Sequence, residues 1–194
     1  MSSTTSDVKL LVLLSGPVAV GKSSVAADLV RDYNFGRIST SPFLVAIAAK
    51  QGVEKNRTSL QQIGDALDDQ TDYRWVVDDV AAVAIDSNPS IGSWLVDSVR
   101  KGRQAQHFRA KYGANVLHVH LNATEALLRE RYQFRLATSG DSITNTPYSI
   151  AIQHPNEVSA RKLIESADVV IDVADLSAAE IAAEILTQSS LRRM

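Results

Sequence analysis

Short, continuous apolar runs recur along the chain and alternate with segments in which apolar residues return every three or four positions. The runs are Val8–Leu14, Gly36–Ser39, Ser93–Asp97, Val116–Leu121 and Val169–Asp172. A short apolar run is typical of a strand buried on both faces, and the longer spacing is typical of an amphipathic helix. Strands that alternate with helices build a parallel sheet with helices on both faces. We therefore predict an α/β fold of three layers, with five parallel strands in one doubly wound sheet.

The helical segments are distributed unevenly between these strands. Three of them, about Ser41–Lys50, Thr58–Asp69 and Tyr73–Asp86, lie between the second and third strands, where one helix would complete the crossover. We expect this helical insertion, about residues 40–86, to bind a second substrate. Residues Ala137–Pro155 are rich in Ser, Thr, Asn, Gly and Pro, which predicts a mobile surface loop. Leu176–Leu186 is expected to form an amphipathic closing helix.

Length and composition fit a single domain. The chain has 194 residues, of which 45% are hydrophobic, and no linker or repeat divides it. Residues 1–7 are mostly small and polar and are expected to form a flexible tail. The formal net charge of −2 and the pI near 6.1 argue against a dedicated nucleic-acid surface.

The absence of cysteine excludes several kinds of chemistry. Without thiols the chain has no disulfide framework, thiolate nucleophile or thiolate metal site. The first apolar run is short, contains Lys9 and leads directly into a glycine-rich loop, so we expect neither a signal peptide nor a membrane span. These features predict a cytoplasmic protein.

The strongest chemical signal is the segment Gly16–Ser23, which reads G-x-x-x-x-G-K-S between the first strand and the first helix. In such a loop, backbone N–H groups converge on phosphates, the lysine reaches the β/γ oxygens and the serine hydroxyl coordinates Mg²⁺. The sequence therefore predicts binding of ATP with Mg²⁺. The residues expected to hold the nucleotide are Gly16, Ala19, Val20, Gly21, Lys22, Ser23 and Ser24, with Lys22 also catalytic.

Asp97 carries the second signal, because it closes the third apolar run. A carboxylate at the carboxyl end of a strand beside the phosphate loop lies where ligands bind in open α/β sheets. Two functional roles are open to Asp97: it orients Mg²⁺ through a water molecule, or it accepts a hydrogen bond from the acceptor group that attacks the γ-phosphate. The structural alternative is an aspartate that caps the following turn.

Three further residues are candidates for binding the acceptor. Arg100 follows Asp97 by three residues, and Arg57 precedes the helix predicted at Thr58–Asp69. A guanidinium matches phosphate geometry better than an ammonium does. Gln61, on that helix, is expected to contact a base or another polar group of the acceptor. For all three, a solvated surface side chain is the alternative.

Arginines also recur in the segment Leu127–Arg135. On a helix, Arg131 and Arg135 lie only ~40° apart, whereas Arg129 and Arg131 are separated by ~160°. Arg131 and Arg135 can therefore serve one site together. The alternative is an exposed helix face whose charges are solvated.

The remaining polar and aromatic candidates are more typical of structure than of chemistry. His118 and His120 alternate along a predicted strand, which favours packing within the sheet over a metal or catalytic role. Trp75 is expected in the core, and Asn156 is expected to cap the penultimate helix. Glu157, the next residue, is a candidate for substrate contact.

Together these motifs resemble those of the P-loop kinases of nucleotides and nucleosides. Asn56–Gly64, Trp94–Arg100 and Leu127–Arg135 are similar to the substrate-binding, third-strand and lid segments of deoxynucleoside monophosphate kinases and archaeal-type dephospho-CoA kinases. Arg37–Ser41 resembles the start of the monophosphate-binding segment of adenylate kinases, but Pro42 and Val45 depart from that pattern.

The resemblance implies an ATP-dependent phosphotransferase whose acceptor is a nucleoside or deoxynucleoside monophosphate. It also implies a lid over about residues 129–156, in which Arg131 and Arg135 cover the donor and neutralise charge on the transferring group. Dephospho-CoA or a sugar nucleotide is the alternative acceptor. A regulatory module that binds or slowly hydrolyses nucleotide is the alternative of another class.

Overall fold

The computed structural model describes residues 8–138 and 146–192 of the chain. The expected N-terminal tail and residues 139–145 of the expected lid lie outside the described residues.

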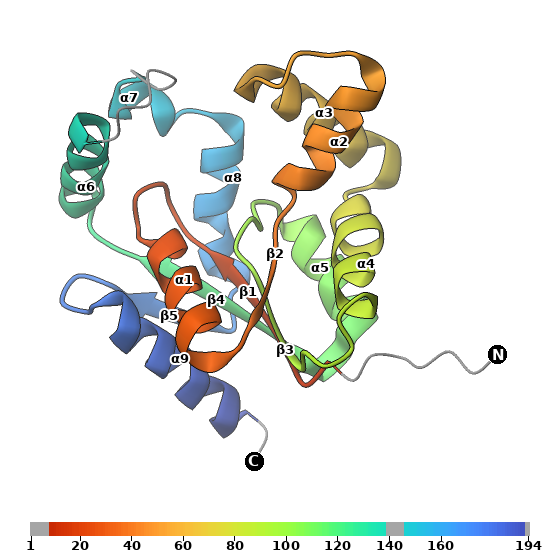
Figure 1. Cartoon of the computed structure of the whole chain (residues 1–194). Coiled ribbons are helices and arrows are strands. Elements are labelled where there is room, and N and C mark those ends of the chain that lie inside the picture. The colour runs from red at the N-terminus through yellow and green to blue at the C-terminus, as the bar shows by residue number, and fades with distance from the viewer. Residues whose placement is uncertain (1–7, 139–145, 193–194) are drawn as a thin grey trace.

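Five parallel strands form one sheet in the order β2-β3-β1-β4-β5, which confirms the predicted α/β fold (Figure 1). The strands are β1 (Leu10–Ser15), β2 (Gly36–Ile38), β3 (Ser93–Val96), β4 (Val116–Asn122) and β5 (Val169–Asp172). β1 is central and pairs with β3 and β4, with Leu11 opposite Trp94 and Ser15 opposite His120. The chain crosses from one half of the sheet to the other beside β1, where open α/β sheets bind their ligands.

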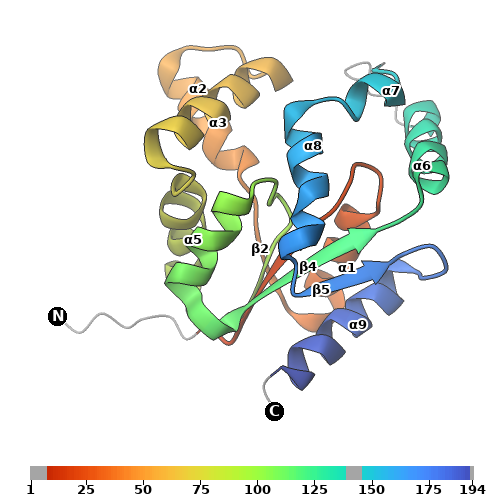
Figure 2. The same ribbon diagram turned by 180° about the vertical axis from the view of Figure 1, so that it is seen from behind.

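Helices cover both faces of this sheet. One face carries α1 (Lys22–Tyr33) and α9 (Ala178–Leu191), and the other carries α4 (Ala82–Asp86) and α5 (Gly102–Tyr112) (Figures 1 and 2). One arm beyond the sheet contains α2 (Ser41–Gln51) and α3 (Arg57–Thr71), and a second contains α6 (Glu125–Thr138), α7 (Tyr148–Ala151) and α8 (Pro155–Lys162). The remaining short helices are η1 (Val76–Ala81), η2 (Gly113–Asn115) and η3 (Leu163–Ser166).

The burial of β1 explains why its sequence is continuously apolar. Leu10, Val12 and Leu14 belong to the hydrophobic cluster that contains α1 and α9. Leu11 and Leu13 belong to the cluster on the opposite face, with η1 and α5. Successive strand residues point to opposite faces, so a central strand between two helical layers must be apolar at every position.

The structure of two segments differs from the prediction. The segment Tyr73–Asp86 is not one regular helix, because the backbone is left-handed at Asp72 and Tyr73 (φ 50° and 65°) and Val76–Ala81 is a π-helix that continues into α4. The segment expected to be a loop up to Pro155 contains α7. A π-helix repeats its apolar residues at nearly the same spacing as an ordinary α-helix, and a single helical turn is too short to show any repeat. The sequence pattern therefore cannot distinguish the first from a regular helix or the second from a loop.

The penultimate helix begins earlier than predicted. His154, and not Asn156, caps α8, because its Nδ1 accepts a hydrogen bond from the Asn156 N–H at 3.2 Å. Pro155 occupies the first helical position, where its fixed φ suits the helix and its missing N–H needs no partner.

His118 and His120 are both buried within the sheet, as predicted. Ser15 Oγ lies 2.8 Å from His118 Nε2 and 2.9 Å from His120 Nδ1, so the hydroxyl joins β1 to both rings. Burial lowers the pKa of His118. Burial also lowers the pKa of His120, to about 4, and unfavourable charge interactions with His118 and Lys22 add to this shift. Both rings are therefore neutral at pH 7.

This burial predicts acid sensitivity. Between pH 6.5 and about 4 the unfolded chain protonates His120 while the native protein does not, so stability falls as pH decreases through this range. At pH 5 we expect His120 alone to cost about 2 kcal/mol of the unfolding free energy present at pH 7. Urea unfolding of the wild type and of His120→Asn at both pH values measures this. An equal pH dependence in the two proteins would contradict the prediction.

Candidate active site

The phosphate loop connects β1 to α1 and has a fixed, partly left-handed backbone. Gly16, Ala19 and Gly21 have φ values of 138°, 65° and 107°. A Cβ atom on Gly16 would lie 2.5 Å from the Leu121 carbonyl oxygen, so only glycine fits between the loop and β4. Ala19 adopts a conformation that disfavours residues with a side chain, which indicates that the surrounding structure imposes it.

Lys22 lies across this loop. Its Nζ donates hydrogen bonds to the carbonyl oxygens of Gly16 at 2.6 Å and Pro17 at 2.8 Å. Burial is the main cause that lowers the pKa of Lys22 to about 8. The negative charges of Glu157 and Asp97 oppose this shift, and the positive charges of Arg100 and Arg135 add to it. Charged groups that follow β3 and that lie on α6 and α8 therefore influence the charge on this ammonium group.

The lowered pKa of Lys22 predicts how nucleotide affinity depends on pH. A polyphosphate beside the ammonium group favours its charged form, so binding above pH 8 takes up a proton. We expect the association constant of Mg·ADP to be unaffected by this group below pH 8 and to fall above it, approaching tenfold per pH unit. Calorimetry at pH 7 to 9.5 in buffers of different ionisation enthalpy measures both effects. In Lys22→Arg the slope should vanish because arginine stays charged; a flat wild-type profile would contradict the assignment.

Asp97 lies just beyond β3, next to β2, and forms an ion pair that the sequence did not predict. Arg37 Nη2, from β2, donates to Asp97 Oδ2 at 2.5 Å, and the Asp97 side chain is only 11% exposed. Beside it, Ser98 Oγ is buried and has no hydrogen-bond partner among the described residues. One signal in the sequence that points to this pair is that Arg37, like Asp97, lies near the carboxyl end of a predicted strand.

Arg100 begins the turn into α5. Its backbone N–H donates to Gln104 Oε1 at 3.1 Å, which helps to close this turn. The charge of Arg100 lowers the pKa of Lys22 and the charge of Asp97 raises it.

The helical insertion reaches the second arm through Gln61. Its side-chain amide lies 2.7 Å from His154 Nε2, which joins α3 to the start of α8. The Gln61 atom nearest to that ring nitrogen is the amide nitrogen Nε2. His154 Nδ1 accepts the capping bond, so a hydrogen bond between the two side chains needs the amide turned so that its oxygen accepts from the ring Nε2–H. Arg57 begins α3 after the Asn56 cap, and its side chain lies outside the described part of the structure.

On the opposite side, α6 places arginines over the loop. Arg131 Nη1 donates to the Val20 carbonyl oxygen and its Nη2 to the Val173 carbonyl oxygen, both at 3.3 Å. The Arg135 guanidinium stacks 5.1 Å from the centre of the Tyr132 ring and influences the pKa of Lys22. Arg131 therefore contacts the loop directly, and Arg135 lies one turn further along α6.

The oxygen donors near the loop fit Mg²⁺. Ser23 offers a hydroxyl in the first turn of α1, and Asp97 offers a carboxylate; Mg²⁺ prefers such oxygen ligands and usually retains water and substrate phosphates as others. Within residues 8–138 and 146–192, no group of three or more His, Cys, Asp or Glu side chains could hold a metal ion by itself.

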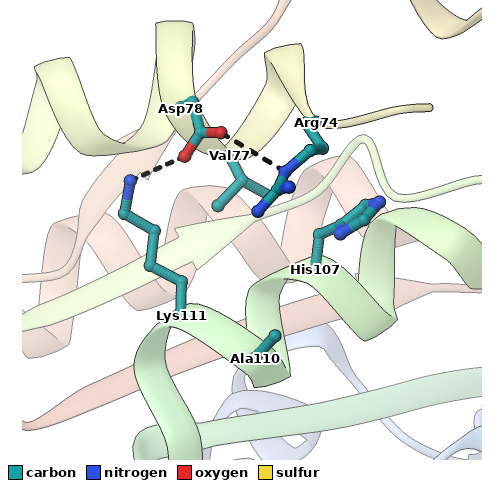
Figure 3. A pocket seen from close by; sticks show the side chains of 6 residues that line it. All are labelled: Arg74, Val77, Asp78, His107, Ala110 and Lys111. Atoms are coloured by element: carbon teal, nitrogen blue, oxygen red, sulfur yellow. Dashed lines mark hydrogen bonds and ion pairs between the residues drawn. The ribbon is translucent and has the colours of Figure 1, made fainter. Parts of the chain in front are cut away.

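A cavity of about 290 Å³ lies elsewhere, between η1 and α5 (Figure 3). Arg74, Val77, Asp78, His107, Ala110 and Lys111 line it. Asp78 pairs with Lys111 at 2.7 Å and with Arg74 at 3.7 Å, so these charges already compensate one another. The phosphate loop contributes nothing to this cavity.

The sheet order, the helical layers and the phosphate loop together define a P-loop kinase fold. Residues 15–151, which include the loop and both arms as far as α7, match the profile of the AAA domain family, and the chain belongs to that family.

Solved structures show the same fold at low sequence identity. The YorR protein of Bacillus subtilis, in complex with phosphorylated GDP, is 18% identical with a TM-score of 0.51, over 94% of this chain and 97% of that one. A sugar kinase from Janibacter sp. is 13% identical with a TM-score of 0.53, over 92% and 93%. An uncharacterised protein from Eubacterium ventriosum is 12% identical with a TM-score of 0.55, over 93% and 98%.

No protein of curated function matched the chain. Among the described residues, no helix combines the length and the apolar character needed to cross a membrane.

Proposed function

We propose that the protein is an ATP- and Mg²⁺-dependent phosphotransferase whose acceptor is a nucleoside or deoxynucleoside monophosphate. One arrangement carries the proposal: Glu157 and Arg131 of the second arm contact the phosphate loop at Val18 and Val20, while Asp97 and Arg100, which follow β3, influence the charge on Lys22. A module that only bound nucleotide would need the loop but not charged groups converging from two sides.

On the donor side, the loop N–H groups and Lys22 would hold the β/γ phosphates, and Ser23 would ligate Mg²⁺. Bound Mg²⁺ neutralises phosphate charge. Arg131 contacts the Val20 carbonyl and Arg135 follows it one turn later on α6, which supports a role for both in stabilising charge on the transferring group.

On the acceptor side, Arg100 would bind the acceptor phosphate, assisted by Arg57 at the start of α3. Asp97, held by Arg37, would orient a metal-bound water when the acceptor is a monophosphate, and would accept a hydrogen bond from the attacking oxygen only when that oxygen is a hydroxyl. Gln61 would contact the acceptor from α3. The unpartnered Ser98 hydroxyl beside Asp97 supports a polar ligand at this position.

Catalysis would then depend mostly on positioning and charge neutralisation. The two arms hold donor and acceptor from opposite sides, so that the acceptor oxygen faces the γ-phosphate. The attacking oxygen forms a bond to phosphorus, the bond to the β-phosphate oxygen breaks, and ADP leaves.

A panel of nucleoside and deoxynucleoside monophosphates, dephospho-CoA and sugar nucleotides, assayed for ADP release with Mg·ATP, tests the proposal. We expect at least one monophosphate to stimulate ADP release strongly. For that acceptor, Arg100→Ala should raise KM at least about tenfold while KM for ATP changes little. Hydrolysis that no acceptor stimulates would favour the regulatory module, and stimulation only by dephospho-CoA or a sugar nucleotide would reassign the acceptor.

A further inference from the structure

Arg161, on α8, connects three separate segments of the second arm. Its Nε donates to Glu157 Oε1 at 3.0 Å, its Nη1 to Glu125 Oε2 at 2.9 Å and its Nη2 to the Tyr148 hydroxyl at 3.1 Å. These partners belong to α8, α6 and α7 respectively. The guanidinium thus uses all three of its nitrogens on three helices.

Glu157 extends this network to the phosphate loop. The same Oε1 atom that pairs with Arg161 accepts a hydrogen bond from the Val18 N–H at 2.8 Å, and the Glu157 side chain is only 13% exposed. Glu157 is also the largest charge influence on the pKa of Lys22. The carboxylate therefore fixes the loop at Val18, and Arg161 fixes the carboxylate.

The other end of the network is on α6, the helix expected to begin the lid. Glu125 begins α6, the helix that carries Arg131 and Arg135. Tyr148 packs against Tyr132 of α6, with ring centres 5.3 Å apart. The Arg135 guanidinium stacks on the same Tyr132 ring. A shift of α6 must therefore move two of the three groups that hold Arg161.

The chemistry of arginine suits this arrangement. A guanidinium is planar with its donors in a fixed fork, so partners in three directions determine both its position and its orientation. The hydrogen bond from Arg161 lowers the pKa of Glu125, which keeps that carboxylate ionised and attractive to the guanidinium. In a partly buried network, loss of one partner leaves the others incompletely paired.

We propose that Arg161 is a positioning residue that transmits the position of α6 and α7 to the phosphate loop through Glu157. The inference rests on the proposed function, because it assumes that the loop binds a nucleotide and that α6 covers it. Arg161 acts through Glu157, which holds the Val18 N–H in the conformation that receives the polyphosphate.

Calorimetric titration with Mg·ADP tests this relay in the full-length protein. In Glu157→Gln an amide oxygen can still accept the Val18 N–H bond, but the charged pair with Arg161 is lost. In Tyr148→Phe only the hydroxyl at the lid end is lost. We expect each variant to weaken Mg·ADP about five- to tenfold, and Arg161→Lys to weaken it at least as much, because an ammonium does not present a fixed fork. Glu165→Gln, on an exposed glutamate of η3, is the matched control and should bind as the wild type does.

The double variant Glu157→Gln/Tyr148→Phe distinguishes a relay from two separate contacts. If both residues act through Arg161, the double variant should bind only about as weakly as the weaker-binding single variant. Losses that multiply would overturn the relay, as would unchanged affinity with a lowered melting temperature, which identifies a merely structural network. A wild-type protein that fails to bind Mg·ADP at all would instead contradict the proposed function.

Discussion

Replacement of Lys22 by methionine is expected to reduce phosphoryl transfer by about a thousandfold or more. The ammonium group is placed at the phosphate loop by its bonds to the Gly16 and Pro17 carbonyls, and it is the loop's only side-chain cation between Gly16 and Ser23. Removal of a single donor that stabilises transition-state charge already costs about 10²- to 10³-fold in enzymes, and Lys22 serves both binding and transfer. Initial rates of ADP release at saturating acceptor measure the loss.

Stability should not account for this loss. Burial lowers the pKa of Lys22, so the native protein holds the charge at a cost, and methionine fills similar space without it. We therefore expect the melting temperature of Lys22→Met to equal or exceed that of the wild type. Lys162→Met, on an exposed lysine of α8, is the control and should transfer normally. Turnover of Lys22→Met within tenfold of the wild type would overturn the assignment of the loop.

The second large effect is expected for Arg131→Ala, which should lower kcat about a hundredfold. Arg131 bridges the Val20 carbonyl of the loop and the Val173 carbonyl that follows β5, so its guanidinium is held at the phosphate loop, where the proposed transfer would develop charge. Because this interaction strengthens in the transition state, KM for ATP should change much less than kcat. Steady-state kinetics at varied ATP separate the two parameters.

Two further variants refine this prediction. Arg131→Lys keeps the charge but cannot bridge both carbonyls, so it should recover only part of the lost rate. Arg31→Ala removes an exposed arginine near the carboxyl end of α1, away from the loop, and should leave kcat unchanged. A rise in KM for ATP without a fall in kcat would contradict the prediction, because it would show that Arg131 binds nucleotide only in the ground state.

Much of the fold could be predicted because its signals are local. Each buried strand had to be a short apolar run, and the central strand β1 had to be apolar at every position since both of its faces are covered. The loop Gly16–Ser23 was equally readable, because backbone N–H groups can converge on phosphates only with glycine at particular positions. The helical spacing of Arg131 and Arg135 was local in the same way, because both fall within α6, about one turn apart.

Contacts within the site were not predicted, and those that were missed share a cause. Arg37 pairs with Asp97 across 60 positions of the sequence, and Glu157 contacts Val18 across 139. No periodicity relates such positions. Gln61 was expected to contact the acceptor, and its hydrogen bond to His154 shows in addition that it joins the two arms.

By itself, the sequence determined the parallel sheet, the phosphate loop and the order of the arms. These features follow from the spacing of apolar residues and the positions of glycines, which are patterns among a few neighbouring residues. Only the tertiary structure decided which charges meet Lys22 and how Arg161 connects α6, α7 and α8 to the loop. Those contacts depend on how crossovers bring distant segments to one edge of the sheet. The physical reason is that a side chain's partners in space are set by packing of whole elements, which no short stretch of sequence encodes.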